Sequence, residues 1–356
     1  MRRIIYHGYG DPIAVLTQID EPTPSPGDGE VLVDLAVRPV HSGDILMVTG
    51  THDPVQRPVP PEGFTPGCEG TGIIEAVGPG VDPSRGFVPG ARVCFCAIGS
   101  WRDKMVLPAD TLMLVPPDVD DDLSAQLSVN PITALLITRE VLEIARNRPG
   151  GVLRLSAAEK VLTEVHEARD DAGIVILSGA GSIVAKLLAA MLREKGFTCL
   201  GTVRSQAVAD ALSAAIGITV VAAENPDWQN QLRAAANGRT TFAALDCVGG
   251  ETGNAMLELL SPGGTLLSYG ALSGEPLVVR QAHLWMAGKK VRGFGMIHWT
   301  QLPYETRAAD MAAATEFVQR SRHLIPLAGE FPLSEIREAV RFFTRPGRSG
   351  AVLIRS

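Results

Sequence analysis

The pattern of apolar and polar positions changes once along the chain, near residue 126. Before that point, short alternating runs lie between glycine- and proline-rich turns, and segments 31–37 and 70–77 are predicted as strands. After it, apolar runs of strand length alternate with segments of helical periodicity. The strands predicted there are 174–178, 199–203, 218–221, 242–246 and 264–269. The helices predicted there are 133–146, 183–195, 206–216, 226–237 and 252–261.

This alternation predicts an α/β fold with right-handed βαβ units and a parallel sheet that is covered on both faces. Near residue 325 the chain becomes β-like again, with a helix predicted over 335–345 and a last strand over 351–354. The C-terminus is therefore expected to pack on the N-terminal domain. The predicted domains are 1–125 together with 298–356, and 126–297.

One segment, 147–172, fits neither pattern. Its sequence Ser156-Ala157-Ala158-Glu159 fits a capping box, and apolar residues follow at helical spacing, which predicts an extra amphipathic helix over 156–169. That helix is either a surface decoration or an element that faces a partner or a carrier protein.

Composition narrows the class of protein. The 356 residues are 46% hydrophobic and 20% charged, the net charge is −7, and no block of lysine and arginine occurs. We therefore expect no nucleic-acid partner and no membrane partner. The sequence shows no signal peptide and no apolar run of transmembrane length, and its five scattered cysteines suit a reducing compartment, so a cytoplasmic location is predicted.

The most informative stretch is a glycine turn between a strand and a helix. The apolar run Ile174–Leu177 is followed by Ser178-Gly179-Ala180-Gly181-Ser182 and then by a helical run, with Ala185 at the third glycine position. Small residues at such a turn let the backbone approach a pyrophosphate at the N-terminus of a helix. The alternative is an ordinary turn between a strand and a helix that binds nothing.

The next strand ends at Arg204-Ser205, where the ribose of the adenosine is read in such folds. An acidic residue there would accept the 2′-hydroxyl of NAD, whereas an arginine suits the 2′-phosphate of NADP. No carboxylate follows along the chain until Asp210. The sequence therefore predicts hydride chemistry with NADPH.

Four stretches together resemble the medium-chain dehydrogenase/reductase superfamily. They are the glycine turn, Gly67–Gly78 with its G-x-E-x-x-G-x-[IV]-x-x-V-G pattern, Asn130–Ala134 and Asp246–Gly250. Within the superfamily, the zinc-free 2-enoyl thioester reductases look most similar, followed by the quinone oxidoreductases. The resemblance implies a GroES-like β-barrel domain, a doubly wound Rossmann domain, an active site in the cleft between them, and a homodimer formed partly near 289–297.

The same resemblance implies which residues bind the cofactor. Asn130 and Thr133 would position the nicotinamide ribose and the substrate, and Tyr269 and Gly270 would lie near the nicotinamide. The full predicted cofactor set is Gly179, Ala180, Gly181, Ser182, Ile183, Val184, Arg204, Ser205, Cys247, Val248, Gly249, Tyr269, Gly270 and Ala271.

A catalytic zinc ion is a separate question, because one branch of the superfamily uses Cys, His and Cys as zinc ligands. Those positions resemble His41, Cys68 and Asn130 here, and asparagine is a poor zinc ligand. Glu69 is a conceivable third ligand. The cysteine cluster of a structural zinc lobe is absent from the sequence, so we expect no metal and regard His41 and Cys68 as cleft-lining groups.

The proton donor is the main departure from the enoyl reductases. Their motif N-P-S-D-I-N-x-I-x-G-x-Y carries a tyrosine, and this chain has His52 at that position and His41-Ser42 in place of Asn-Pro. His52 is a candidate acid, because histidine titrates near neutrality, and His41 is a rival. The alternative is that His52 is a surface loop residue. Asp44 is assigned to the substrate pocket.

The remaining expectations concern substrate and activity. Trp299 matches an aromatic residue of the acyl pocket, or else it packs in the core, and Gly295 replaces a second aromatic residue and would widen the pocket. The sequence thus favours NADPH-dependent reduction of an activated C=C bond, most of all that of a trans-2-enoyl thioester carried by coenzyme A or acyl carrier protein. The alternatives are an NADPH:quinone oxidoreductase or alkenal reductase, then a zinc alcohol dehydrogenase or a non-catalytic NADPH-binding protein.

Overall fold

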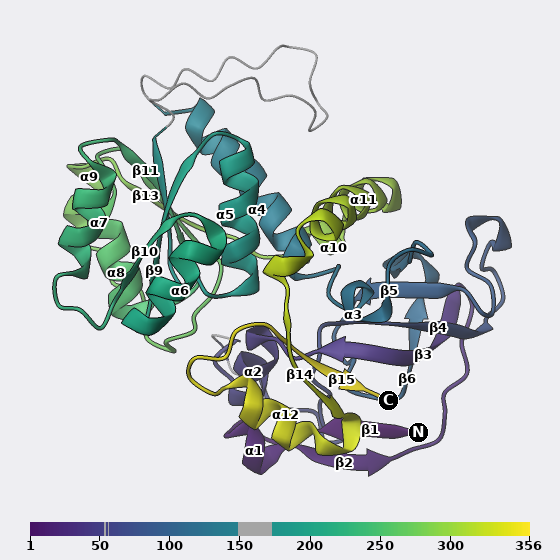
Figure 1. The fold of residues 1–356 in the computed structure, drawn as a ribbon. Coiled ribbons are helices and arrows are strands. Elements are labelled where there is room, and N and C mark those ends of the chain that lie inside the picture. The colour runs from purple at the N-terminus through teal and green to yellow at the C-terminus, as the bar shows by residue number, and fades with distance from the viewer. Residues whose placement is uncertain (53–54, 56, 149–172) are drawn as a thin grey trace. The chain divides into compact units, whose positions relative to one another are not determined.

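The chain forms two compact units. The computed structural model describes residues 1–52, 55, 57–148 and 173–356 (Figure 1). The first unit comprises Met1–Ile132 and Met296–Ser356, and the second comprises Thr133–Gly295. The helix predicted over 156–169 lies outside the described residues.

The second unit contains a six-stranded sheet of the order β10-β9-β8-β11-β12-β13, and every pair of neighbouring strands is parallel. This is the doubly wound arrangement predicted from the alternation of strands and helices. The strands are β8 (Ile174–Leu177), β9 (Thr198–Val203), β10 (Thr219–Ala222), β11 (Thr241–Asp246), β12 (Thr265–Ser268) and β13 (Lys290–Gly293). Because β8 and β11 are buried along their whole length, β8 and the middle of β11, Phe242–Leu245, read as continuous apolar runs in the sequence.

Helices cover both faces of this sheet. In Figure 1, α5 and α6 lie on one face and α7 and α8 on the other. The helices are α4 (Asn130–Arg146), α5 (Ile183–Glu194), α6 (Gln206–Ile216), α7 (Trp228–Ala236), α8 (Gly250–Leu259) and α9 (Gln281–Trp285). One core joins Ile174, Ile176 and Ala244 of the sheet to Trp228 and Met256 of the helices. The bounds predicted for α6 are the observed ones. Helix α4 begins three residues earlier than predicted, and α8 begins two residues earlier than predicted.

The first unit is mostly β, as the turn-rich composition predicted. Its larger sheet has the order β14-β15-β3-β4-β5-β7, with β6 also paired to β3, and β1 pairs with β2 in a separate ribbon. The strands are β1 (Arg2–Ile5), β2 (Thr17–Asp20), β3 (Glu30–Pro39), β4 (Glu69–Val77), β5 (Arg92–Cys96), β6 (Lys104–Pro108), β7 (Leu112–Leu114), β14 (Leu327–Pro332) and β15 (Ala351–Arg355).

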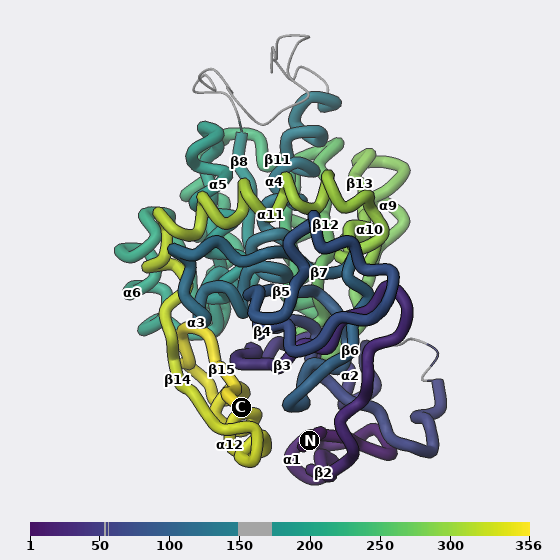
Figure 2. Tube along the Cα trace, turned by 90° about the vertical axis from the view of Figure 1, so that its right-hand side faces the viewer, coloured from purple at the N-terminus to yellow at the C-terminus, as the bar shows by residue number. Residues whose placement is uncertain are grey.

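The C-terminal segment completes this sheet. β15 pairs antiparallel with β3 of the N-terminal segment, as the sequence predicted for the end of the chain. Figure 2 shows β14 and β15 side by side, with α12 against them. The helices of this unit are α1 (Pro12–Val15), α2 (Ser42–Thr49), α3 (Asp121–Ser124), α10 (Ile297–Thr300), α11 (Tyr304–Arg320) and α12 (Ile336–Phe343).

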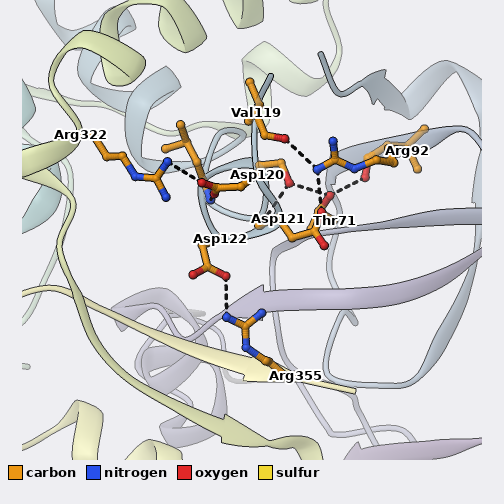
Figure 3. Close-up of polar contacts among 11 residues, drawn as sticks. Thr71, Arg92, Val119, Asp120, Asp121, Asp122, Arg322 and Arg355 are labelled. Carbon is orange, nitrogen blue, oxygen red and sulfur yellow. Dashed lines mark hydrogen bonds and ion pairs between the residues drawn. The ribbon is translucent and has the colours of Figure 1, made fainter. Parts of the chain in front are cut away.

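An acidic run at α3 is neutralised by three arginines from distant parts of this unit (Figure 3). Asp121 pairs with Arg92 of β5 at 2.6 Å, and Asp122 pairs with Arg355 of β15 at 2.6 Å. Asp120 pairs with Arg322 at 2.5 Å and also accepts a hydrogen bond from the backbone N–H of Leu123, which caps α3. The acidic run is thus paired internally.

Candidate functional site

The predicted cofactor residues lie at one edge of the parallel sheet. Gly179–Val184 follow β8, Arg204 and Ser205 follow β9, Cys247–Gly249 follow β11, and Tyr269–Ala271 follow β12. The carboxyl ends of neighbouring parallel strands meet at the same edge, which is where ligands bind in such sheets. The order of the strands reverses between β8 and β11, so this edge includes a topological switch point.

A buried carboxylate joins the two strands at the switch point. Ser178 Oγ donates to Asp246 Oδ1 at 2.6 Å and accepts a hydrogen bond from the N–H of Cys247 at 2.9 Å. Asp246 also accepts hydrogen bonds from the N–H groups of Val248 and Gly249 at 3.0 and 3.1 Å. The side chain of Asp246 is fully buried, and these bonds satisfy it. They hold the loop after β11 against the glycine turn.

The two glycines of the turn are needed for different reasons. Gly179 has φ +54°, and a Cβ there would lie 2.8 Å from Cys247 Sγ, so the turn itself requires glycine. At Gly181 a Cβ would meet nothing nearer than the Val203 and Val208 side chains, both at 4.0 Å. Ser182 caps α5 by accepting a hydrogen bond from the N–H of Ala185 at 3.2 Å. The fold does not require glycine at 181, but a pyrophosphate close to the backbone would.

The loop after β12 closes the same edge. The N–H of Tyr269 donates to Asp246 O at 2.8 Å, and a Cβ on Gly270 would lie 2.8 Å from Cys247 O. The Tyr269 hydroxyl lies beside the Cys247 and Ser182 side chains, but it forms no well-aligned hydrogen bond within the described residues. Burial raises the pKa of this hydroxyl well above its ordinary value. A buried donor without a partner, the open space at Gly181 and the N-terminus of α5 together fit a bound dinucleotide.

A second buried carboxylate organises the first unit. Glu69, at the start of β4, is fully buried, and its Oε1 lies 2.7 Å from His41 Nε2. Its Oε2 accepts hydrogen bonds from the N–H groups of Ser128 and Val129 at 2.9 and 2.8 Å. Glu69 therefore fixes both His41 and the loop that leads into α4 at Asn130. From the sequence alone, Glu69 was a candidate only for a zinc ligand. Its partners lie 28 and 59 residues away along the chain, so spacing could not reveal this role.

His41 and its neighbours form a buried polar cluster. Burial lowers the pKa of His41, but the hydrogen bond and the charge of Glu69 outweigh it, so the pKa is raised overall. Asp44 Oδ2 accepts a hydrogen bond from the N–H of His41 at 2.7 Å, and Asp44 is fully buried. Burial raises the pKa of Asp44 to about 6 and that of the neighbouring Cys68 thiol well above its usual range.

The residues that resemble zinc ligands have other partners in the structure. Glu69 is engaged by His41 and by two N–H groups, and Asp44 caps the start of α2. Within the described part of the chain, no three histidine, cysteine or acidic side chains are grouped so that they could hold a metal ion. Asp44 thus has a structural role in α2, and its assignment to the substrate pocket stays a prediction.

The other predicted residues of the site are distributed over both units. His52 is exposed three residues after α2 ends, and its N–H donates to Leu46 O at 3.1 Å. Trp299 is buried, and its indole N–H donates to Asp310 Oδ2 at 2.9 Å, an arrangement that suits core packing. Gly295 is exposed at the end of the second unit, and Thr133 is buried in the first turns of α4. The predicted roles of these residues in catalysis and substrate binding stay predictions.

Comparison with known families agrees with this geometry. Residues 27–117 match the model of the alcohol dehydrogenase GroES-like domain, and residues 138–314 match that of the zinc-binding dehydrogenases. The chain belongs to the medium-chain dehydrogenase/reductase superfamily. The predicted pairing of a GroES-like domain with a Rossmann domain is thereby confirmed.

Individual relatives cover nearly the whole chain. Mitochondrial enoyl-[acyl-carrier-protein] reductase of Bos taurus is 26% identical, over 97% of this chain and 86% of that protein, and the Homo sapiens enzyme is 25% identical with the same coverage. Among solved structures, Escherichia coli quinone oxidoreductase complexed with NADPH superposes with a TM-score of 0.80 at 19% identity, covering both chains completely. The Pseudomonas syringae quinone oxidoreductase gives a TM-score of 0.78 at 20% identity, covering 100% of this chain and 99% of that one.

The two glycines of the turn provide a matched pair of substitutions. Gly181→Ala should leave the thermal midpoint within about 1–2 °C of the wild type, because its Cβ has room, yet weaken NADPH binding at least about tenfold. Gly179→Ala should lower both stability and binding, because of its positive φ and its contact with Cys247. Differential scanning fluorimetry and titration of NADPH fluorescence measure the two effects. Normal NADPH affinity in Gly181→Ala would show that the pyrophosphate lies elsewhere.

Asp44 should make the stability of the chain depend on pH. Since its pKa is raised from 3.8 to about 6, the folded chain binds this proton more tightly than the unfolded chain. The contribution of Asp44 to stability is therefore present at low pH and is lost as pH rises through about 4 to 7, by about 3 kcal/mol. Asp44→Asn, which keeps an acceptor for the His41 N–H, should flatten this slope in urea unfolding, whereas the exposed Asp34→Asn should not. Equal slopes in both variants would refute the assignment.

Proposed function

We propose that this protein catalyses the NADPH-dependent reduction of an activated C=C bond, most of all that of a trans-2-enoyl thioester. The observation that carries the proposal is the similarity to enoyl-[acyl-carrier-protein] reductases over 97% of the chain, together with a sheet edge that fits a dinucleotide. The protein is accordingly an NADPH-dependent oxidoreductase. The pathway that follows from this substrate is fatty acid metabolism.

Bound NADPH would supply a hydride to the β carbon of the substrate, and a proton would be added at the α carbon. The part of this chain is to bind and orient the cofactor. The N-terminus of α5 and the N–H groups at Gly179–Ser182 would hold the pyrophosphate. Arg204, which is exposed just after β9, would pair with the 2′-phosphate. Asn130 and Thr133, at the start of α4, would position the nicotinamide ribose and the substrate.

The proton would come from a histidine in place of the tyrosine of related reductases. His52 occupies the position of that tyrosine and is exposed, so it can exchange protons with water. As charge develops on the thioester oxygen, a protonated imidazole would stabilise it. The rival, His41, is 9% exposed, and its Nε2 is engaged by Glu69. Its raised pKa favours the protonated form that an acid needs, which makes His41 the second candidate acid.

The second candidate function is reduction of a quinone or an alkenal. It is favoured by the quinone oxidoreductases among the solved structures and by the absence of a tyrosine at position 52. Such a reaction depends on the proximity and orientation of the hydride donor more than on a dedicated acid. The substrate dependence of turnover distinguishes the two functions.

We also propose a homodimer formed through the edge of the second unit's sheet. β13 is the terminal strand of that sheet, so one row of its N–H and C=O groups has no strand partner in the described structure. The preceding helix α9 ends in exposed apolar residues, with Trp285 at 75% and Met286 at 72% exposure. An edge strand beside such residues is typical of an interface between copies of a chain.

No helix in the described part of the chain has the length and apolar character to cross a membrane. The cytoplasmic location stays a prediction, since the Bos taurus and Homo sapiens relatives are named as mitochondrial proteins.

The rate of NADPH oxidation tests both the substrate and the proton donor. NADPH oxidation should be fast with trans-2-enoyl thioesters of one chain length and slow with a simple quinone. His52→Ala should lower kcat for the thioester about 100-fold with a smaller change in KM, as for the loss of a general acid. His41→Asn keeps a donor for Glu69 and serves as the comparison. A loss confined to His41→Asn would move the acid to His41, and quinone turnover alone would establish the second candidate function.

The exposed apolar residues at the end of α9 allow the proposed dimer to be tested. Trp285→Ser combined with Met286→Ser should convert a dimer to a monomer in sedimentation velocity, because it removes apolar area from the proposed interface. Ile98→Ser, in the first unit, removes an apolar side chain that is 54% exposed and should leave the assembly unchanged. A wild-type monomer, or an unchanged dimer in the double variant, would contradict this interface.

A further inference from the structure

An exposed carboxylate, that of Glu224, lies beside the expected 2′-phosphate position. Glu224 follows β10, and its Oε1 accepts a hydrogen bond from the N–H of Gln206, the first residue of α6, at 2.8 Å. Its own N–H donates to Arg204 O at 3.0 Å, which extends the pairing of β10 with β9 beyond the two strands. Glu224 thus reaches the end of the neighbouring strand, where Arg204 and Ser205 are placed to read the adenosine ribose.

The first turn of α6 belongs to the same edge as the glycine turn. A Cβ built on Gly181 would lie 4.0 Å from both Val203, at the end of β9, and Val208, in the first turn of α6. The open space at Gly181 is therefore bordered by the segment that Glu224 caps. A dinucleotide whose pyrophosphate lies at Gly181 would have its adenosine ribose near Arg204 and Gln206.

The cap of α6 is unusual for its sequence. Ser205 is the N-cap residue, yet its hydroxyl makes no capping hydrogen bond, and the side-chain cap comes from Glu224 instead. Arg204 is exposed, and the described part of the chain shows no ion pair of its guanidinium. A 2′-phosphate would bind to the Arg204 guanidinium, the Ser205 hydroxyl and the N–H groups at the start of α6. Glu224 already accepts a hydrogen bond from one of these N–H groups.

We propose that Glu224 is a specificity-determining residue that weakens the preference of this protein for NADPH over NADH. Its carboxylate occupies the N–H of Gln206. A 2′-phosphate at this edge would compete for that N–H, and the two anions would repel each other. NADH carries no 2′-phosphate and does not meet this repulsion. This inference rests on the proposed function only in placing the adenosine half of the cofactor at this edge.

The test measures binding of cofactor fragments rather than turnover. The dissociation constants of 2′,5′-ADP and 5′-AMP are measured by isothermal titration calorimetry on the full chain at low salt. Glu224→Gln keeps an oxygen that can accept the Gln206 N–H and removes the charge. It should tighten 2′,5′-ADP about fivefold or more and change 5′-AMP less than about twofold. The gain should shrink at high salt, because the repulsion is screened.

Asp210→Asn is the matched control. Asp210 is the other carboxylate in contact with Gln206, through the side-chain amide at 2.7 Å, and it lies one turn further along α6. Its substitution should change neither dissociation constant. Unchanged 2′,5′-ADP affinity in Glu224→Gln, equal tightening of both fragments, or an equal gain in Asp210→Asn would overturn the inference. Selective tightening in an enzyme that reduces neither thioesters nor quinones would uphold this inference and reject the proposed reaction.

Discussion

The second unit depends on one buried carboxylate. Asp246 has no exposed surface, and its charge is tolerated because a serine hydroxyl and two backbone N–H groups point at it. Those donors belong to the loops that follow β8 and β11, so Asp246 fixes the two loops relative to each other. In that arrangement Gly179 lies so close to Cys247 that a Cβ on it would be 2.8 Å from the Cys247 Sγ. The need to satisfy this one buried charge thus ties together two of the loops at the proposed dinucleotide site.

The first unit solves a similar problem with Glu69. Here the donors are a histidine side chain and two N–H groups of a loop, and the loop leads directly into α4. Loss of one of these donors would leave a buried charge partly unpaired and would strongly destabilise the folded chain. The positions of the donors are therefore closely constrained. Both carboxylates therefore orient groups with proposed roles, Asn130 and the glycine turn, without touching a substrate themselves.

Regular patterns predicted most of the fold. Strands such as β8 and β11 could be predicted because burial on both faces makes β8 and the middle of β11 apolar. Helix α6 could be predicted because its apolar residues repeat at helical spacing. The 17-residue helix α11 was missed, because its buried face carries Arg307, Asp310 and Thr315 beside its apolar residues. Arg307 is bonded to the C=O groups of Leu302 and Asp110, and such pairings leave no periodic signal.

The candidate site was predicted in outline, because a glycine turn between a strand and a helix is local in sequence. The sequence did not predict which residues of different strands meet at the edge of the sheet. A search along the chain after Arg204 finds Asp210 as the first carboxylate, but Glu224, fourteen positions further on, follows the neighbouring strand and accepts a hydrogen bond from Gln206. Parallel strands are joined by crossover helices, so residues that meet at one edge are separated by a helix and a strand. The charge near the proposed ribose position is therefore decided by the order of the strands, and sequence distance from the glycine turn is a poor guide to it.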